Sequence, residues 1–210
     1  MSAGGRRIEI VRAGLWAVRL HQHQPGAGVE PGYSLGEASC AEADELAQAM
    51  SVRPEVAVRR FLHGSRAWAA RSPQGAIAAW LWVSVGRQRA EPIGRTLVLA
   101  PDEAYGWDAG TLATHRRRGL FTSLLEAAGG TMRCEGRTVM WGGIHDHNVA
   151  SRRANIRAGF WPVLRMSVLR LGQRGLIRTH AVAYADPDLV ERAYRLLTGG
   201  GGAIGRLGGA

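Results

Sequence analysis

Short segments of alternating or continuous apolar residues recur along the chain, and they predict β-strands. Segments 68–71 and 76–86 flank the turn sequence 72–75, a pattern that predicts a β-hairpin. Residues 21–38 are rich in Gly, Pro and Gln, which is typical of a loop. The other predicted strands are 6–20, 96–114 with a break near Pro101, 138–145, 160–171 and 177–185.

Helical spacing occurs between and after these strands. Ser39 and Glu42 have the spacing of a capping box at the start of a predicted helix 39–50. Pro54 suits the first turn of a second helix, 54–64. The remaining predicted helices are 118–128, 149–158 and 187–197. Strands that alternate with helices predict a mixed α/β fold.

The length of 210 residues suits one domain, which we place at residues 1–198. Residues 199–210 are rich in glycine, and we expect this tail to be disordered because it cannot offset its ordering entropy. No apolar run has the length of a membrane span, so we expect a soluble protein of the cytoplasm. The two cysteines, Cys40 and Cys134, lack the pattern of a disulfide framework or a zinc ribbon.

The net charge is +10, and every basic residue that contributes to it is an arginine. A positive field favours an anionic ligand or an acidic partner surface. The basic residues are not interleaved with aromatic ones as in proteins that bind single strands, so nucleic acid is disfavoured as a partner. The sequence leaves a homodimer open.

The segment 114–130 combines three arginines, Arg116, Arg117 and Arg118, with Gly119 just before an apolar helical pattern. A helix that starts in this way turns several unpaired backbone N–H groups toward one point, where the helix dipole adds positive character. Such a helix start suits a phosphate or diphosphate group. The alternative is that the three arginine side chains bind no ligand and form a solvated face at the start of the helix.

A second motif lies about thirty residues further along. Asn148 or Ser151 can cap the start of the predicted helix 149–158. Gly159 stands where a left-handed residue ends a helix, and Phe160 can fold back on the last turn. Taken without their context, these two motifs describe ordinary capped helices in any α/β domain.

The two motifs together resemble the GNAT acetyltransferases. The spacing from Arg116 to Gly119 is similar to the family's coenzyme A loop, Gln/Arg-x-x-Gly-x-Gly/Ala, although Phe121 stands where the family has Gly or Ala. The segment from Asn148 to Phe160 resembles the family's second signature, Asn-x-x-Ala/Ser followed by a helix that ends at Gly-Phe.

The resemblance implies the GNAT fold, a mixed central sheet with helices on both faces and two splayed strands that form a cleft for an acyl-CoA. It implies acetyl-CoA as cosubstrate, with the pantetheine arm bound to backbone of residues 109–112 and the diphosphate on the amides of 117–122. The residues expected at this cosubstrate are Ala109, Thr111, Leu112, Arg116, Arg117, Arg118, Gly119, Leu120, Phe121, Thr122, Asn148 and Ser151.

Acyl transfer needs a group that takes the proton of the amine, and His145, His147 and Asp108 are the candidates. Histidine is suited to this task near neutral pH. The alternative is that both histidines are surface residues at a strand end. A metal site is disfavoured because a third or fourth ligand at usable spacing is missing, so no metal is expected.

Asn155 stands where GNAT enzymes often have a tyrosine that protonates the leaving thiolate. An amide has no dissociable proton for this purpose, although it can donate a hydrogen bond to sulfur. Tyr105 and Trp107 are further candidates for the border of the acceptor site, with burial in the core as the alternative.

The sequence therefore predicts an enzyme that transfers an acetyl group from acetyl-CoA to a primary amine. The expected acceptor is a small amine, an amino sugar or a nucleotide-linked amino sugar, and the arginines favour an acidic one. Two alternatives stay open: acetylation of a protein N-terminus or lysine, and a non-catalytic CoA-binding module of the same fold.

Overall fold

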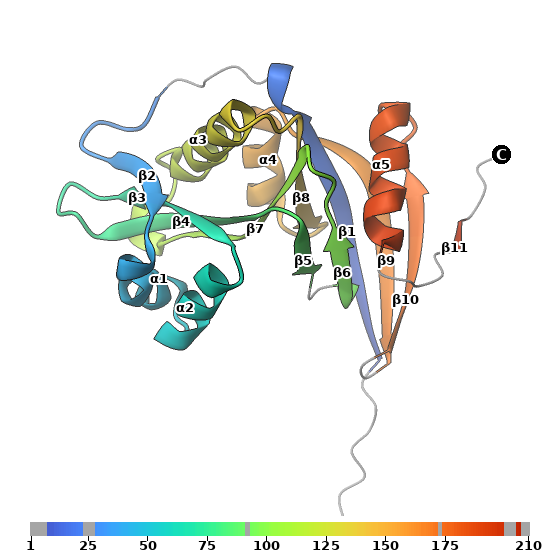
Figure 1. Cartoon of the computed structure of the whole chain (residues 1–210), viewed down its shortest axis with the longest axis horizontal. Coiled ribbons are helices and arrows are strands. Elements are labelled where there is room, and N and C mark those ends of the chain that lie inside the picture. Colours follow the sequence, from blue (N-terminus) through green and yellow to red (C-terminus); the bar gives the residue numbers. More distant parts are fainter. Residues whose placement is uncertain (1–7, 23–27, 91–92, 172–173, 200–204, 207–210) are drawn as a thin grey trace, which may run out of the picture.

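A computed structural model describes residues 8–22, 28–90, 93–171, 174–199 and 205–206, and within them nine strands form one mixed sheet (Figure 1). The strand order is β11-β10-β9-β1-β8-β7-β4-β3-β2. The strands of this sheet are β1 (Ile8–Arg19), β2 (Ser34–Ala38), β3 (Arg66–Arg71), β4 (Ile77–Ser84), β7 (Glu103–Thr111), β8 (Val139–His145), β9 (Trp161–Leu171), β10 (Arg174–Ala181) and β11 (Gly205–Arg206). A separate antiparallel pair consists of β5 (Arg87–Ala90) and β6 (Arg95–Val98).

Five α-helices lie in the described ranges and cover both faces of the sheet (Figure 1). They are α1 (Ala43–Met50), α2 (Pro54–Leu62), α3 (Leu120–Cys134), α4 (Val149–Arg157) and α5 (Pro187–Thr198). No helix in the described residues is both long and apolar enough to cross a membrane.

Strand alternation decides which face each side chain covers. Along β4, Leu81 and Val83 join the core under α3, whereas Trp82 between them joins the core under α1 and α2. In β8, Met140 packs on the α3 side and Trp141 packs toward the β5–β6 pair and α5. The sheet thus separates an α3 face from an opposite face, on which α1, α2, α5 and the β5–β6 pair lie.

The neighbouring strands β7 and β8 diverge along their length. Their parallel pairing covers four residue pairs and ends at Gly106 and Gly142. Both strands continue, β7 to Thr111 on β4 and β8 to His145 on β1. Because each strand keeps only its outer neighbour, their inner edges open a gap in the middle of the sheet.

The first strand of the chain lies in the interior of the sheet rather than at its edge. β1 pairs antiparallel with β8 on one side and with β9 on the other. Its residue Ala13 is the partner of His145, the last residue of β8. The N-terminal strand therefore supports the wall of the gap on the β8 side.

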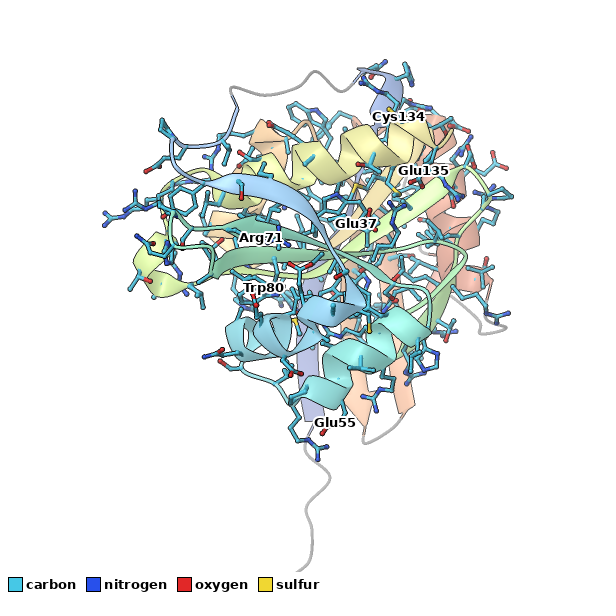
Figure 2. All side chains as sticks on the ribbon, turned by 60° about the vertical axis from the view of Figure 1, so that its left-hand side comes forward. Glu37, Glu55, Arg71, Trp80, Cys134 and Glu135 are labelled. Carbon is cyan, nitrogen blue, oxygen red and sulfur yellow. The ribbon has the colours of Figure 1, made fainter. Side chains whose placement is uncertain are left out.

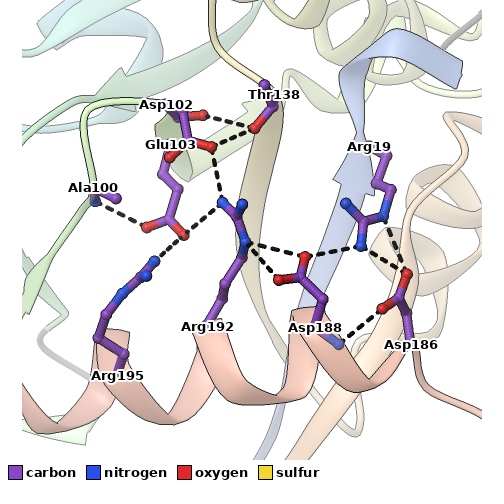
Figure 3. A network of polar contacts seen from close by, with 9 residues as sticks. All are labelled: Arg19, Ala100, Asp102, Glu103, Thr138, Asp186, Asp188, Arg192 and Arg195. Atoms are coloured by element: carbon purple, nitrogen blue, oxygen red, sulfur yellow. Dashed lines mark hydrogen bonds and ion pairs between the residues drawn. The ribbon is translucent and has the colours of Figure 1, made fainter.

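Charged contacts attach α5 to the sheet (Figure 3). The ion pairs include Arg192–Asp102 at 2.8 Å, Arg195–Glu103 at 2.6 Å and Arg19–Asp186 at 2.7 Å. Glu103 has an exposed fraction of 0% and also accepts a hydrogen bond from the backbone N–H of Ala100. Burying a carboxylate is costly unless it is paired, and the contacts with Ala100 and Arg195 compensate this cost for Glu103 where α5 packs on the sheet.

The same contacts lower the pKa of two carboxyls, the half-buried Asp102 and the exposed Asp186. The hydroxyl of Thr138 and then the guanidinium of Arg192 lower the pKa of Asp102. The guanidinium of Arg19 lowers the pKa of Asp186. Each shift favours the charged form and therefore stabilises the folded state at neutral pH.

The structure confirms most of the predicted elements and corrects others. Residues 34–38 are not loop but form the edge strand β2, which pairs with β3. Helix α3 extends to Cys134 instead of ending at 128, because Gly129 and Met132 are buried against the core and this packing outweighs the low helix propensity of glycine. Strand β5 falls in a segment for which no strand was predicted.

Of the tail 199–210, residues 200–204 and 207–210 lie outside the described residues. Gly205 and Arg206 form β11 and pair in parallel with β10, where the sequence predicted disorder.

Candidate active site

A cleft of about 1080 Å³ passes through the sheet where β7 and β8 diverge. On the α3 face its walls are residues 116–122 and helix α4. On the opposite face they include Arg60 of α2 and Arg89 and Ala90 of β5. Because the cleft has walls on both faces, two ligands can approach its centre from opposite sides.

At the α3 end of the cleft, backbone N–H groups lack acceptors. Gly119 caps α3 in the left-handed conformation with φ of 73°, and Arg117 before it also has a positive φ of 65°. Within the described residues, the amides of 117–122 have no hydrogen-bond acceptor. Amides of this kind, together with the helix dipole, suit an anionic group such as a phosphate.

Two further observations at α3 fit an anionic ligand. A Cβ built on Gly119 meets no atom within 4 Å, so the space in front of this turn is open in the described structure. The hydroxyl oxygen of Thr122 is buried beside the cleft without a hydrogen-bond partner among the described residues. A buried hydroxyl without a partner is costly, and a ligand oxygen would satisfy it.

The arginine side chains of the loop have different surroundings. Arg118 forms an ion pair with Glu30, and its guanidinium lies 5.8 Å from the ring centre of Tyr33. Arg116 donates from Nε to the carbonyl oxygen of Thr111 at 3.3 Å, which fixes the loop to the end of β7. An anion at this turn would therefore be held by backbone amides, and Arg118 would have to leave Glu30 to contribute.

β7 contains a β-bulge at the centre of the cleft. Pairing with β4 shifts by one residue between Trp107 and Gly110, so Asp108 and Ala109 together oppose Leu81. Asp108 adopts a positive φ of 38°, which non-glycine residues rarely do. A bulge leaves its extra residue unpaired and turns backbone groups out of the ladder. An amide at this bulge can therefore donate to a ligand in the cleft.

The Asp108 side chain points to the opposite face and binds Arg60 at 2.5 Å. The guanidinium of Arg60 lies 4.6 Å from the ring centre of Trp107 and 5.1 Å from that of Trp82. Cation–π contacts with two rings hold this arginine in place. The carboxylate of Asp108 is thus committed to a salt bridge, and this makes it a poorer candidate for the base than the sequence indicated.

Gly110 continues β7 after the bulge, and Trp80 covers it. A Cβ at Gly110 would lie 2.3 Å from the ring of Trp80, so only glycine fits this position. Trp80 is labelled in Figure 2, where all described side chains are drawn. The absence of a side chain at Gly110 lets Trp80 pack flat over the strand that carries the bulge.

The two histidines differ in their relation to the cleft. His145 ends β8, is half-buried and lines the cleft on the face opposite α3. His147 is exposed and does not line the cleft, although its ring centre is 5.3 Å from that of His145. The geometry therefore favours His145 over His147 as the base.

Helix α4 borders the cleft on the α3 face. Asn148 caps it by accepting a hydrogen bond from the Ser151 amide at 3.0 Å, as the sequence predicted. Asn155 is buried, with an exposed fraction of 4%, and its Nδ2 donates to the carbonyl and hydroxyl oxygens of Ser151. Since both donations go to Ser151, Asn155 has only its carbonyl oxygen left for the cleft and cannot donate to a thiolate in this arrangement.

Tyr105 stands at the point where β7 and β8 separate. Its hydroxyl lies so close to Gly143 that a Cβ there would be 2.6 Å from the phenol oxygen. Burial raises the pKa of Tyr105 to about 12, and the nearby backbone N–H of Gly143 acts in the opposite direction. The phenol therefore stays protonated at neutral pH and is a neutral hydrogen-bond donor in the cleft wall.

Most of the predicted site residues meet at this cleft. The lining residues among them are Asp108, Ala109, Thr111, Arg116, Arg117, Arg118, Gly119, Leu120, Phe121, Thr122, His145, Asn148, Ser151 and Asn155.

Leu112 and His147 do not line the cleft. The amide of Leu112 donates to the carbonyl of Ala78 and its carbonyl accepts from the amide of His115, so its backbone is engaged outside the cleft. His147 lies after the end of β8, beyond the reach of the sheet that positions His145. Leu112 follows the end of β7 and His147 follows the end of β8, so neither residue is positioned at the cleft by its strand.

Sequence reasoning missed several cleft residues, Arg60, Arg89, Arg153 and Arg157 among them. Arg153 and Arg157 are four residues apart on α4, a spacing that puts them on one side of the helix and could have indicated a common role. No pattern in the sequence near Arg60 indicates a role in the site, because its salt-bridge partner Asp108 is 48 positions away. No group of three or more potential metal ligands lies together within the described residues.

Comparison with solved structures identifies the fold as that of the GNAT acetyltransferases. A GNAT-family protein from Novosphingobium aromaticivorans aligns with a TM-score of 0.57 and 16% identity over 80% of this chain and 68% of its own. A tandem GNAT protein from the clavulanic acid biosynthesis pathway aligns with a TM-score of 0.58 and 21% identity, over 85% and 55%. A GNAT acetyltransferase from Colwellia psychrerythraea aligns with a TM-score of 0.57 and 11% identity, over 79% and 57%.

The chain thus spans 55% to 68% of the length of these three solved proteins. Comparison of the sequence with protein-family models and with curated proteins gives no match. At these identities the likeness establishes the fold, and the reaction has to be argued from the site.

Proposed function

We propose that this chain, which has the GNAT fold, is an acetyl-CoA-dependent N-acyltransferase that acetylates a primary amine of a small molecule. The acceptor class that we propose is a small amine, an amino sugar or a nucleotide-linked amino sugar. One observation carries the proposal: the cleft joins the unpaired amides at the start of α3 to the opposite face of the sheet.

The residues at the α3 end fit the cosubstrate. The amides of 117–122 would bind the diphosphate, and the Thr122 hydroxyl would find its missing partner there. Among the described residues, no strand pairs with the inner edge of β7 beyond Gly106, so residues 109–111 can bind an extended pantetheine arm as a further strand would be bound. When bound, acetyl-CoA supplies the activated acetyl thioester.

The chain's own groups would then promote the transfer. An amide of the bulge at Asp108 and Ala109 would donate to the carbonyl oxygen where negative charge develops. The imidazole of His145, on the acceptor side, would accept the proton of the attacking amine. Because the donors of Asn155 are bound to Ser151, we assign no side-chain acid to the leaving thiolate.

A non-catalytic CoA-binding module is the second candidate, and the environments of Asp108 and Asn155 favour it. One of the three proposed bases is in a salt bridge, and the residue at the usual place of the acid has no free donor. A module of this kind needs only the α3 end of the cleft.

The test combines binding with turnover. We expect acetyl-CoA to bind with a dissociation constant in the micromolar range in calorimetry. Release of free CoA thiol across a panel of small amines, amino sugars and peptides would then identify the acceptor class. Absence of binding would overturn the proposal. Binding without thiol release above hydrolysis would select the non-catalytic module, and release with peptides alone would select a protein N-terminus or lysine.

A further inference from the structure

A small cavity, here the apolar annex, lies between the sheet and the layer formed by α5 and the β5–β6 pair. Its volume is about 40 Å³. Six apolar residues line the annex and not the cleft, namely Ala13, Leu15, Ile93, Leu97, Met166 and Leu197. All six are buried, so these walls of the annex consist of hydrocarbon.

The annex adjoins the cleft beside the proposed base. Ala90, Tyr105, Gly143, Ile144 and His145 line both spaces. Three of these residues are the last three of β8, which follow the point where its pairing with β7 ends. The annex therefore lies directly beside the centre of the cleft, along the part of β8 that follows Gly142.

The polarity of the lining residues indicates which ligand suits the annex, the acyl group or the acceptor amine. The route to the bulge on the face opposite α3 is polar, since Arg60 and Asp108 line it. A primary amine and its polar substituents would keep favourable partners along that route. Tyr105 and His145 supply the only polar side chains among the lining residues of the annex, so hydrocarbon fits its interior.

The position of the bulge points the acyl chain toward the annex. A carbonyl bound at Asp108 or Ala109 lies on the β7 side of the gap, and the annex opens on the β8 side at residues 143–145. A chain that extends from that carbonyl across the gap would enter the annex. Resting on the proposed function, we propose that the annex binds the outer carbons of a longer acyl group, so that the protein accepts propionyl and butyryl thioesters as well as acetyl and binds them more tightly.

The volume limits the chain length. A space of about 10–15 Å³ by this measure holds one water-sized group, so the annex holds about three groups of methylene size. This length corresponds to butyryl, whose three carbons beyond the carbonyl fill the space. Leu97 and Leu197 are the most buried of the lining residues, and a longer chain such as hexanoyl would have to displace buried side chains.

Filling an apolar cavity strengthens binding in proportion to the carbon buried. Each additional methylene group should tighten binding by about fourfold. Butyryl-CoA should accordingly bind about fifteenfold more tightly than acetyl-CoA, whereas hexanoyl-CoA should bind less tightly than butyryl-CoA.

The experiment measures the affinity of acetyl-, propionyl-, butyryl- and hexanoyl-CoA for the full chain by calorimetry, with thiol release as a second readout. Ala13→Leu fills the annex and should abolish the gain from acetyl to butyryl while acetyl-CoA still binds. Ala17→Leu is the matched control, because Ala17 is buried on the same face of β1 but does not line the annex. If Ala13→Leu fails to fold, Leu97→Ala enlarges the annex and should move the optimum to hexanoyl.

Flat or falling affinity from acetyl to butyryl in the unmodified protein would overturn this inference and leave the proposed function intact. A gain that appears with longer apolar amines instead of longer acyl groups would also overturn it. Failure of every thioester to bind would remove the proposed function itself.

Discussion

At Gly119, a substitution that adds a single carbon should allow the effect on ligand affinity to be measured apart from the effect on the stability of the fold. It caps α3 with φ of 73°, and a Cβ there would project into open space in front of the amides of 117–122. Alanine at Gly119 should strain the backbone and occupy part of the space for the diphosphate. Glutamate should add a negative charge beside it.

Substitution of Gly119 should have a backbone cost and, for glutamate, an additional charge cost, and the magnitude of each can be estimated. A left-handed backbone costs a residue other than glycine about 1–2 kcal/mol. For a carboxylate about 5 Å from a phosphate charge, Coulomb's law gives about 1–3 kcal/mol of repulsion between effective dielectric constants of 80 and 20. The charge alone should therefore weaken acetyl-CoA binding by about five- to 150-fold in Gly119→Glu.

Gly136→Ala is the matched control for the backbone term. Gly136 lies just after the other end of α3, has φ of 82° and also has no atom within 4 Å of a built Cβ. Urea denaturation should show a similar loss of stability for Gly119→Ala and Gly136→Ala. Calorimetry should show weaker acetyl-CoA binding for the Gly119 variants only.

Salt provides an internal check on the charge term. The extra loss in Gly119→Glu relative to Gly119→Ala should shrink as ionic strength rises, because salt screens exposed charges. Unchanged acetyl-CoA affinity in Gly119→Glu would refute the placement of the diphosphate at this helix start. An equal loss of affinity in Gly136→Ala would attribute the effect to stability instead.

Three further predictions concern the proposed base and the docking of α5. His145→Ala should remove the rising limb of the pH–rate profile for amine acetylation, whereas His147→Ala should leave it; the reverse result would restore His147 as the base. The ion pair of Asp186 lowers its pKa, so its stabilising contribution is complete above the pKa of an unfolded aspartate and disappears as pH falls through the lowered value. The urea midpoint should therefore fall below about pH 4, and less steeply in Asp186→Asn; parallel curves would contradict this origin. Arg195→Met leaves the buried carboxylate of Glu103 with weaker partners. The free energy of unfolding measured in urea should fall by about 1–3 kcal/mol. A change within about 0.5 kcal/mol, as at an ordinary surface site, would show that the remaining contacts suffice.

Local signals in the sequence were reliable where neighbouring residues alone decide the structure. The capping box of Ser39 and Glu42 is present, Pro54 opens α2, and Gly159 ends α4 with a positive φ. Each of these features satisfies backbone groups of its own segment, so no distant contact is required. The position of Asn148 as the cap of α4 follows the same rule.

Sequence patterns gave wrong predictions where contacts between distant parts of the chain determine the local structure. The sequence 34–38 becomes a strand because β3 supplies the pairing partner. Helix α3 passes through two glycines because the core holds its last turns. Asp108 looked like a free carboxylate until the fold brought Arg60 of α2 next to it.

The sequence by itself determined most of the strands and helices, the two motifs and the helix start suited to a phosphate, because these depend on spacing along the chain. Only the tertiary structure decided that pairing between β7 and β8 stops at Gly106 and Gly142, that His145 rather than His147 reaches the cleft, and that an apolar annex adjoins it. The physical reason is that a gap between strands and a cavity between layers are bounded by residues far apart in sequence, whose proximity exists only after folding.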